Sequence, residues 1–288
     1  MNGALRRGSL YLMLAALLTG ALWRGGYFPT PTAAFGFPGS LLTPRWSLTA
    51  LLLLAGAWEL AALAAERRAA FLRSPLLWLF TAFTVSAGLT YFWSRFPAVT
   101  VRDFLLLLAL WSAFVVARGQ GLRFPGESSR TISWWLVYTA AFVCAWGIAT
   151  YVLRMSPYAN EVDGIFRAGG TLEYSNALGC FALMAMPFAA ALMRGAEKGD
   201  LPLLGAALTL QAGAVMLSLS RLALMLLALM SIYLLVESRG GMRFVLTLSS
   251  LCFGLGLAAV SMLAAEAGLG GKGLLLPAAL AALGYFAQ

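Results

Sequence analysis

Residues 166–180 read FRAGGTLEYSNALGC and contain two elements that recur along the whole chain. A polar loop with adjacent glycines, Gly169 and Gly170, runs directly into an apolar segment that continues to Met193. An apolar run of this length between polar loops is typical of a helix that is buried or embedded in lipid. Similar runs precede and follow it, so the sequence predicts an all-α protein built from apolar helices.

The composition indicates that these helices cross a membrane. Of the 288 residues, 61% are hydrophobic and 11% are charged, and the mean hydropathy is +0.84. Soluble globular domains carry roughly 25% charged residues. The net charge of +9 does not indicate nucleic-acid binding, because the sequence has no basic stripe with interleaved aromatic residues. The enrichment of cytoplasmic loops in Lys and Arg explains the positive charge instead.

A polytopic transmembrane helix bundle of about nine or ten spans is therefore predicted, as a single transmembrane domain over residues 1–288. A span needs about 20 apolar residues, within roughly 17–25. With a cytoplasmic N-terminus, 12 of the 20 Lys and Arg residues fall in cytoplasmic loops, and the reverse orientation would invert that ratio. The predicted spans are residues 10–23, 47–65, 76–93, 104–117, 132–153, 171–193, 201–219, 222–236, 244–265 and, as a tenth candidate, 273–288.

The first of these runs has an alternative interpretation. It follows Arg6 and Arg7, and it has the charge and length of a signal peptide. A retained first helix is favoured, because no convincing A-x-A cleavage site follows and many spans do.

Histidine is absent from the sequence, and the three cysteines are isolated. Cys144, Cys180 and Cys252 each lie in an apolar run without CxxC spacing, which is typical of small apolar core residues. The lack of histidine removes the commonest general base and metal ligand. We therefore expect neither a metal site nor a cofactor.

Two polar side chains fall inside predicted spans. Glu59 is either a proton-relay or substrate carboxylate, or the partner of an arginine on a neighbouring helix, and the second role is the more usual one. Gln211 is predicted to form a hydrogen bond between helices.

Arg221 is the most isolated charge in the chain, with no other charged residue within 15 positions on either side. It is either an anchor at a helix end that extends to the membrane surface, or a clamp for an anion in a wet cavity. Ser218 would share a helical face with Arg221 if the helix continues through both residues. Ser220 could add a hydroxyl group to such a clamp.

Arg167, taken alone, is most simply a solvated loop residue, but its surroundings favour anion binding. Adjacent glycines allow the backbone to approach a ligand closely or to adopt a positive φ. Thr171 can cap the following helix, whose N-terminus would bind phosphate groups. A guanidinium beside such a helix start would hold a diphosphate through two hydrogen bonds. The residues predicted to take part at the two arginine sites are Arg167, Gly169, Gly170, Thr171, Glu173, Asn176, Ser218, Ser220 and Arg221.

These two stretches resemble motifs of a known family. Residues 166–177 resemble the Arg-x-x-Gly-x-x-x-x-x-Asn-Ala signature of the O-antigen ligase and O-antigen polymerase superfamily of bacterial inner-membrane proteins. Residues 217–221, LSLSR, are similar to the Thr/Ser-x-Ser-Arg motif that follows in that family at about this separation. Trp93 and Ser94, shortly before Arg102, also fit its N-terminal half. The resemblance covers about residues 45–265.

The resemblance implies a metal-independent glycosyltransferase of the bacterial cytoplasmic membrane that acts in cell-surface polysaccharide biosynthesis. Such enzymes take a glycan from an undecaprenyl-diphosphate carrier on the extracytoplasmic side and pass it to another glycan. By analogy, Arg167 and Arg221 would hold the diphosphate and stabilise it as it leaves. The acceptor, and the choice between ligase and polymerase, stay open.

The chain also departs from the family pattern. Family members carry a large extracytoplasmic loop with a histidine and then further helices, so we expect this chain to lack a C-terminal part. The carboxylates that could replace the histidine are those of Glu161, Asp163 and Glu173. Two rival hypotheses are a transporter or flippase for an anionic solute or lipid-linked sugar, and an inactive family remnant.

Overall fold

The computed structural model describes residues 3–22, 44–66, 69–162, 164–197, 199–238 and 241–286, and 85% of the structure is helical. The prediction of a nearly all-α protein is confirmed. Among these described residues, seven helices are long and apolar enough to cross a membrane, which suggests a multi-pass membrane protein; this is fewer long spans than the predicted nine or ten. These seven segments are Ser47–Ala65, Pro75–Trp93, Pro97–Arg123, Glu127–Val152, Ser175–Arg194, Leu201–Ser218 and Met242–Glu266.

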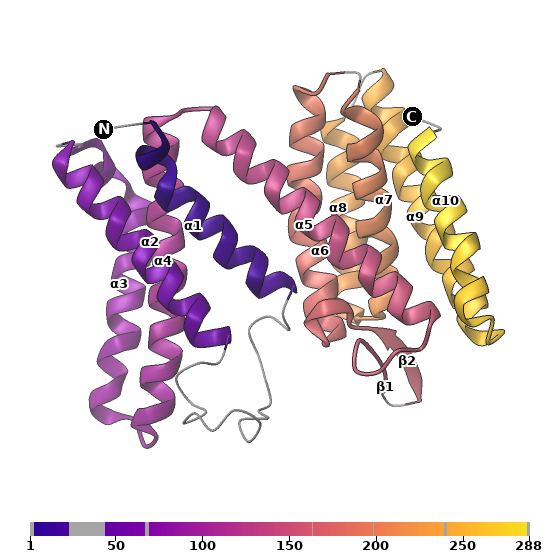
Figure 1. The fold of residues 1–288 in the computed structure, drawn as a ribbon, viewed down its shortest axis with the longest axis horizontal. Coiled ribbons are helices and arrows are strands. Elements are labelled where there is room, and N and C mark those ends of the chain that lie inside the picture. Colours follow the sequence, from indigo (N-terminus) through magenta and orange to yellow (C-terminus); the bar gives the residue numbers. More distant parts are fainter. Residues whose placement is uncertain are drawn as a thin grey trace. The chain divides into compact units, whose positions relative to one another are not determined.

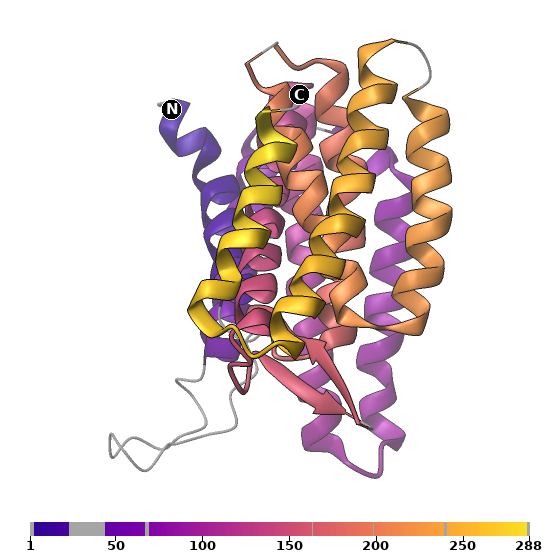
Figure 2. The same ribbon diagram turned by 90° about the vertical axis from the view of Figure 1, so that its right-hand side faces the viewer.

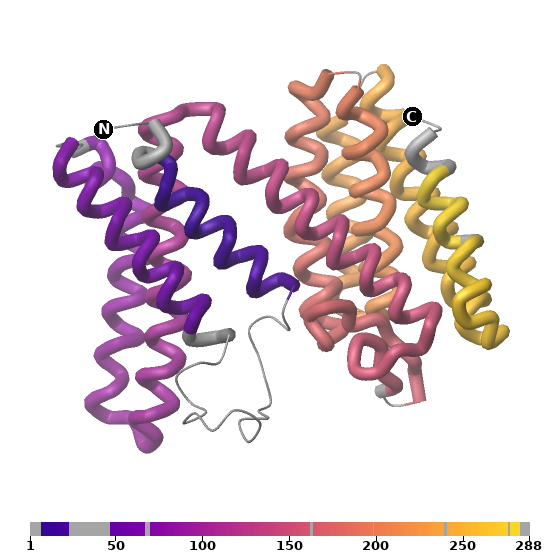
Figure 3. Tube along the Cα trace, in the orientation of Figure 1, coloured from indigo at the N-terminus to yellow at the C-terminus, as the bar shows by residue number. Residues whose placement is uncertain are grey.

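Contacts divide the chain into two compact units, Met1–Thr131 and Ile132–Gln288. The predicted single transmembrane domain and the cytoplasmic position of the N-terminus stay predictions. Figure 3 traces the described residues of each unit in colour. The elements in chain order are α1 (Gly3–Leu22), α2 (Pro44–Ala65), the 3-10 helix η3 (Ala69–Arg73), α3 (Pro75–Leu89), η4 (Thr90–Trp93), α4 (Pro97–Arg123), α5 (Glu127–Val152), β1 (Ala159–Val162), β2 (Ile165–Ala168), η5 (Gly170–Leu172), α6 (Ser175–Arg194), α7 (Leu201–Ser218), α8 (Arg221–Glu237), α9 (Met242–Glu266), η6 (Gly270–Leu274) and α10 (Leu275–Phe286).

In the first unit, α2 and α4 pack along each other, and α1 and α3 lie against this pair (Figure 1). An apolar cluster of Leu63, Phe71, Leu77 and Val115 fills the space between α2, η3, α3 and α4. One face of α3 is exposed and carries large apolar side chains, as expected for a helix that contacts the hydrocarbon core of a membrane. A cluster of buried polar residues lies on α1, α2 and α4 and is described below.

In the second unit, α7 is the central helix and packs against α6, α8, α9 and α10. It is the most buried of the seven candidate spans, at 67%. A helix that is hydrophobic on all sides belongs in such a position. The helices alternate in direction, so α6 and α8 begin at the end of the unit where α7 ends (Figure 1).

A short antiparallel hairpin of β1 and β2 covers that same end of the second unit (Figure 2). Its register places Asn160 opposite Arg167 and Glu161 opposite Phe166. β2 contacts both α7 and α6. The hairpin therefore brings residues 159–168 to the start of α6, where the sequence predicted anion binding.

Candidate functional site

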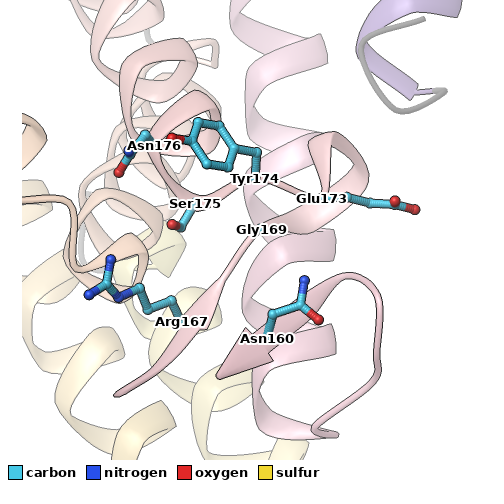
Figure 4. Close-up of a pocket in the computed structure, with 7 residues that line it drawn as sticks. All are labelled: Asn160, Arg167, Gly169, Glu173, Tyr174, Ser175 and Asn176. Carbon is cyan, nitrogen blue, oxygen red and sulfur yellow. Dashed lines mark hydrogen bonds between the residues drawn. The ribbon is translucent and has the colours of Figure 1, made fainter. Parts of the chain in front are cut away.

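A pocket of about 210 Å³ opens between the hairpin and the start of α6 (Figure 4). Four of the predicted residues, Arg167, Gly169, Glu173 and Asn176, line it together. The other predicted residues do not line it. The sequence interpretation missed three further lining residues: Asn160, Tyr174 and Ser175.

The two glycines shape the pocket in different ways. Both backbone N–H groups donate to the carbonyl oxygen of Tyr158 at 2.8 Å, which ties the end of β2 to the loop before β1. A Cβ on Gly169 would lie 2.9 Å from the carbonyl carbon of Glu173, so only glycine fits this close approach. Gly170 has φ +57°, and a Cβ added there would lie 3.3 Å from the Cα of Gly147 on α5. Gly169 therefore lines the pocket, whereas Gly170 packs against α5 and does not line it.

The start of α6 has no side-chain cap. Tyr174 occupies the N-cap position without a capping hydrogen bond from its side chain, and the first helical bond runs from the N–H of Leu178 to the carbonyl of Tyr174 at 3.0 Å. The first N–H groups of α6 therefore have no partner within the helix, and they carry the positive end of its dipole. Such a helix start binds anions.

Two predictions about this helix are wrong. Thr171 is not its cap, because Thr171 lies buried in η5, before the helix begins. The helix starts at Ser175 and not at residue 171, because Glu173 adopts φ +55° and interrupts the chain between η5 and α6.

Arg167 is the basic residue of the pocket. It is half-buried on β2, and its Nε is buried without a hydrogen-bond acceptor. In the part of the chain that the structure describes, Arg167 forms no ion pair. Figure 4 shows its guanidinium and the Ser175 hydroxyl on one side of the pocket, whereas the Glu173 side chain points away from both. The guanidinium is therefore oriented for an acceptor that comes from outside the chain.

The carboxylates considered as substitutes for histidine lie in different places. Glu161 is exposed on β1 and does not line the pocket. Glu173 lines the pocket but points away from Arg167. Asp163 lies outside the described residues.

Arg221 is exposed at the first position of α8. The predicted tight turn before it is confirmed, since α7 ends at Ser218 and Leu219 has φ +48°. The helix does not continue, so Ser218 and Arg221 do not share a helical face as predicted. The Ser220 hydroxyl instead caps α8 by accepting a hydrogen bond from the N–H of Ala223 at 3.4 Å. Ser218 donates to the carbonyl of Val215 at 2.7 Å.

Close packing joins the starts of α6 and α8. A Cβ on Gly179 of α6 would lie 2.8 Å from the Cβ of Ala223 and 2.8 Å from the Oγ of Ser218. The first turns of α6 and α8 therefore lie side by side, next to the end of α7. Arg167 and Arg221 occupy the same end of the second unit, but Arg221 does not line the pocket.

A second polar cluster lies inside the first unit and involves Glu59, which is fully buried on α2. Its carboxylate accepts hydrogen bonds from Ser9 of α1 at 2.6 Å and from Gln120 of α4 at 2.9 Å, and it pairs with Arg123 of α4 at 2.9 Å. Arg123 also donates to Glu66 at 2.9 Å. Of the two roles considered for Glu59, the structure confirms the pairing with an arginine of a neighbouring helix. We refer to Ser9, Glu59, Glu66, Gln120 and Arg123 as the Glu59 cluster.

The other residues considered from the sequence give mixed outcomes. The predicted interhelical hydrogen bond of Gln211 is not formed: its amide is fully buried on α7, and neither amide atom has a hydrogen-bond partner. Thr209 instead forms a hydrogen bond between α7 and α9, donating from its hydroxyl to the carbonyl of Ser250 at 3.3 Å. Cys144 is a buried core residue as predicted, whereas Cys180 and Cys252 are exposed.

Comparisons with protein-family models, with curated proteins and with solved structures give no match to this chain. The function is therefore inferred from the geometry of the second unit and from the motifs in its sequence. The geometry consists of an arginine without an acceptor, an uncapped helix start and a second arginine at the same end of the unit.

Proposed function

We propose that the chain is a multi-pass protein of the bacterial cytoplasmic membrane that transfers or polymerises a glycan from an undecaprenyl-diphosphate carrier. The observation that carries the proposal is Arg167, whose Nε is buried without an acceptor in an open pocket beside the uncapped start of α6. The seven apolar helices support a position in the membrane. The distribution of Lys and Arg supports a cytoplasmic N-terminus, which places the pocket on the extracytoplasmic side.

The chemistry of the pocket suits a phosphate group. A guanidinium offers a planar fork of N–H donors that matches two phosphate oxygens, and a helix start adds backbone N–H donors and a positive dipole end. Arg221 stands at the first position of α8, which packs against α6. A diphosphate carries enough oxygens to engage both arginines, one through each phosphate.

In the proposed reaction, an acceptor hydroxyl attacks the anomeric carbon of the carrier-linked sugar and gives its proton to water in the open pocket. The bond from that carbon to the diphosphate oxygen breaks, and the diphosphate leaves with the electron pair. Arg167 and Arg221 would stabilise the negative charge that develops on it, a type of electrostatic assistance that is often the largest single contribution to catalysis. The resemblance to the O-antigen ligase and polymerase superfamily supports this assignment at the same two arginines.

The test is to replace each arginine and measure glycan transfer or polymer formation in membranes. Arg167→Ala and Arg221→Ala should each reduce the rate by about 100-fold or more, the loss seen when one charge-stabilising donor is removed. Arg167→Lys should retain part of the activity, because it keeps the charge but loses the planar fork. The matched control is Lys272→Ala, which removes an exposed cation on η6 at the same end of the unit but outside the pocket. Normal polysaccharide formation by both arginine variants, with the proteins inserted in the membrane, would refute the assignment.

The rival function is transport or flipping of an anionic solute or lipid-linked sugar. The observation that favours it is the Glu59 cluster, because ionisable groups buried among membrane helices often mark ion and substrate pathways. The two functions differ in their products. Vesicles with the purified protein that accumulate or translocate the anion without any transfer product would favour transport.

A further inference from the structure

The pocket contains more neutral hydrogen-bonding groups than an anion requires. We propose that Tyr174, Asn176 and Asn160 form a subsite for the sugar residue joined to the diphosphate, so that the pocket distinguishes a glycan-bearing carrier from a bare one. This inference rests on the proposed function, and it names the part of the substrate that these side chains contact.

The first observation is the exposure and the hydrogen bond of the Tyr174 side chain. Its side chain is 60% exposed at the start of α6 and lines the pocket. Its hydroxyl accepts a hydrogen bond from the Nδ2 of Asn176 at 2.9 Å, which fixes the ring although little packs around it. An aromatic ring held at a pocket wall offers an apolar face with a polar edge. The C–H face of a sugar ring complements that face, and its hydroxyl groups complement the edge.

The second observation is that the amides in the pocket are neutral. Asn160 lies opposite Arg167 in the hairpin, and its Nδ2 donates to the carbonyl of Pro157 at 2.7 Å. Asn176 uses an N–H on Tyr174. Each amide carries two N–H donors and an acceptor oxygen, so both keep hydrogen-bonding capacity. A group that both donates and accepts suits sugar hydroxyls, whereas an anion needs only donors.

The third observation is the arrangement of these groups around the proposed phosphate position. Figure 4 shows the Arg167 guanidinium and the Ser175 hydroxyl on one side of the pocket, with Tyr174 and Asn176 next to them. A water molecule has a share of about 30 Å³ in the liquid, so a pocket of about 210 Å³ has the volume of about seven waters, which is more than the five heavy atoms of one phosphate group fill. A phosphate bound by Arg167 would place its sugar substituent against Tyr174 and Asn176.

The experiment titrates the purified full chain in nanodiscs with two probes: undecaprenyl diphosphate, and the same carrier bearing one N-acetylglucosamine. We expect the wild type to bind the sugar-bearing probe about tenfold more tightly. Tyr174→Ala and Asn176→Ala should each lose about five- to tenfold of that affinity, the scale of one or two hydrogen bonds. Both should bind the bare carrier within about twofold of the wild type. The affinity of Tyr174→Phe for the sugar-bearing probe should lie between those of the wild type and Tyr174→Ala, because this variant keeps the ring.

The matched control is Tyr233→Ala, because Tyr233 is a comparably exposed tyrosine, at 51%, near the far end of α8. Equal affinity of the wild type for the two probes would overturn the sugar subsite. An equal loss for both probes in Tyr174→Ala and Asn176→Ala, or no loss in either, would also overturn it. Arg167→Ala separates this inference from the proposed function. If it binds both probes like the wild type, the proposed function itself fails, whereas weaker binding of both leaves that function standing.

Discussion

Arg123 in the first unit and Arg167 in the second are both arginines with buried nitrogen atoms in an apolar protein, but their partners differ. Arg123 is 3% exposed and pairs with Glu59 and Glu66 of its own chain, each at 2.9 Å. Arg167 has a buried Nε without an acceptor and lines an open pocket. A buried charge is very costly unless it is paired. Carboxylates of the first unit pair with Arg123, whereas no ion pair to Arg167 forms among the described residues of the second unit.

This difference separates a structural role from a binding role more reliably than the presence of charge does. On sequence alone, Glu59 inside an apolar run is as strong a functional candidate as Arg221. The contacts of Glu59 with α1 and α4 show that its carboxylate holds three helices together. A loss of stability is therefore the expected effect of mutation in the first unit, and a loss of ligand binding is the expected effect in the second.

The largest effect on stability is expected from Glu59→Leu. It leaves Arg123 buried with one of its two carboxylates missing, and breaking a buried pair from one side costs about 3–5 kcal/mol. Thermal or denaturant unfolding of the purified protein in detergent would measure the loss. Arg167→Met should change stability by less than about 0.5 kcal/mol, because it removes no pair.

The double variant Glu59→Leu with Arg123→Leu tests the cause of this loss. Removing both charges avoids an unpaired ion, so more than half of the lost stability should return. If the double variant loses as much stability as the two single variants together, the cost comes from packing and not from charge. That result would contradict the contrast drawn between Arg123 and Arg167.

A smaller effect is expected from Gly119→Ala on α4. A Cβ there would lie 2.1 Å from the Oε1 of Glu59, so the carboxylate or the helix must move, at a cost of about 1–3 kcal/mol. Gly121→Ala on the same helix is the matched control, because its Cβ would meet nothing within 4 Å. That control should stabilise by about 0.5–1 kcal/mol through helix propensity. Equal effects of the two changes would show that the Glu59 carboxylate does not fill the space beside α4.

A smaller loss of stability is expected from Ser220→Ala in the second unit. The substitution removes the cap of α8, and loss of an N-cap costs about 0.5–2 kcal/mol. The hydrogen bond is long, at 3.4 Å, so a value near the lower end is expected. If Ser220 acts only as a cap, glycan transfer per folded molecule stays unchanged. A large loss of transfer with full stability would instead place its hydroxyl in the substrate site, as the sequence predicted.

The apolar runs predicted the positions of the helices well, and their ends less well. The run 104–117 predicted a short fourth span, yet α4 extends over Pro97–Arg123. Its last turns contain Gln120 and Arg123, whose polar side chains are buried and contact the Glu59 carboxylate. Hydropathy reports which residues can face lipid, whereas the helix ends where its backbone hydrogen bonds end. A partner carboxylate on another helix is not visible in a local run.

The candidate site was predictable where motifs marked it. Arg167, Gly169 and Asn176 lie in one stretch and meet in one pocket. Asn160 was missed because no strand was expected. The Asp163-Gly164 dipeptide is a hairpin-turn signal, and a hairpin around it would have placed Asn160 opposite Arg167. The φ of +55° at Glu173 had no such signal, so the true start of α6 and the role of Tyr174 could not be derived.

The contact at Gly179 brings the starts of two helices close together. Without a side chain there, the starts of α6 and α8 lie in direct contact, and both helices point the positive ends of their dipoles toward the same side. Two like partial charges, with Arg221 at the tip of α8, repel each other, and both the negative end of α7 beside them and the packing at Gly179 oppose that repulsion. A multivalent anion at this end would relieve the repulsion as it binds. If the second unit binds an anion there, as proposed, binding adds to its stability, and its melting temperature should rise with the anion concentration.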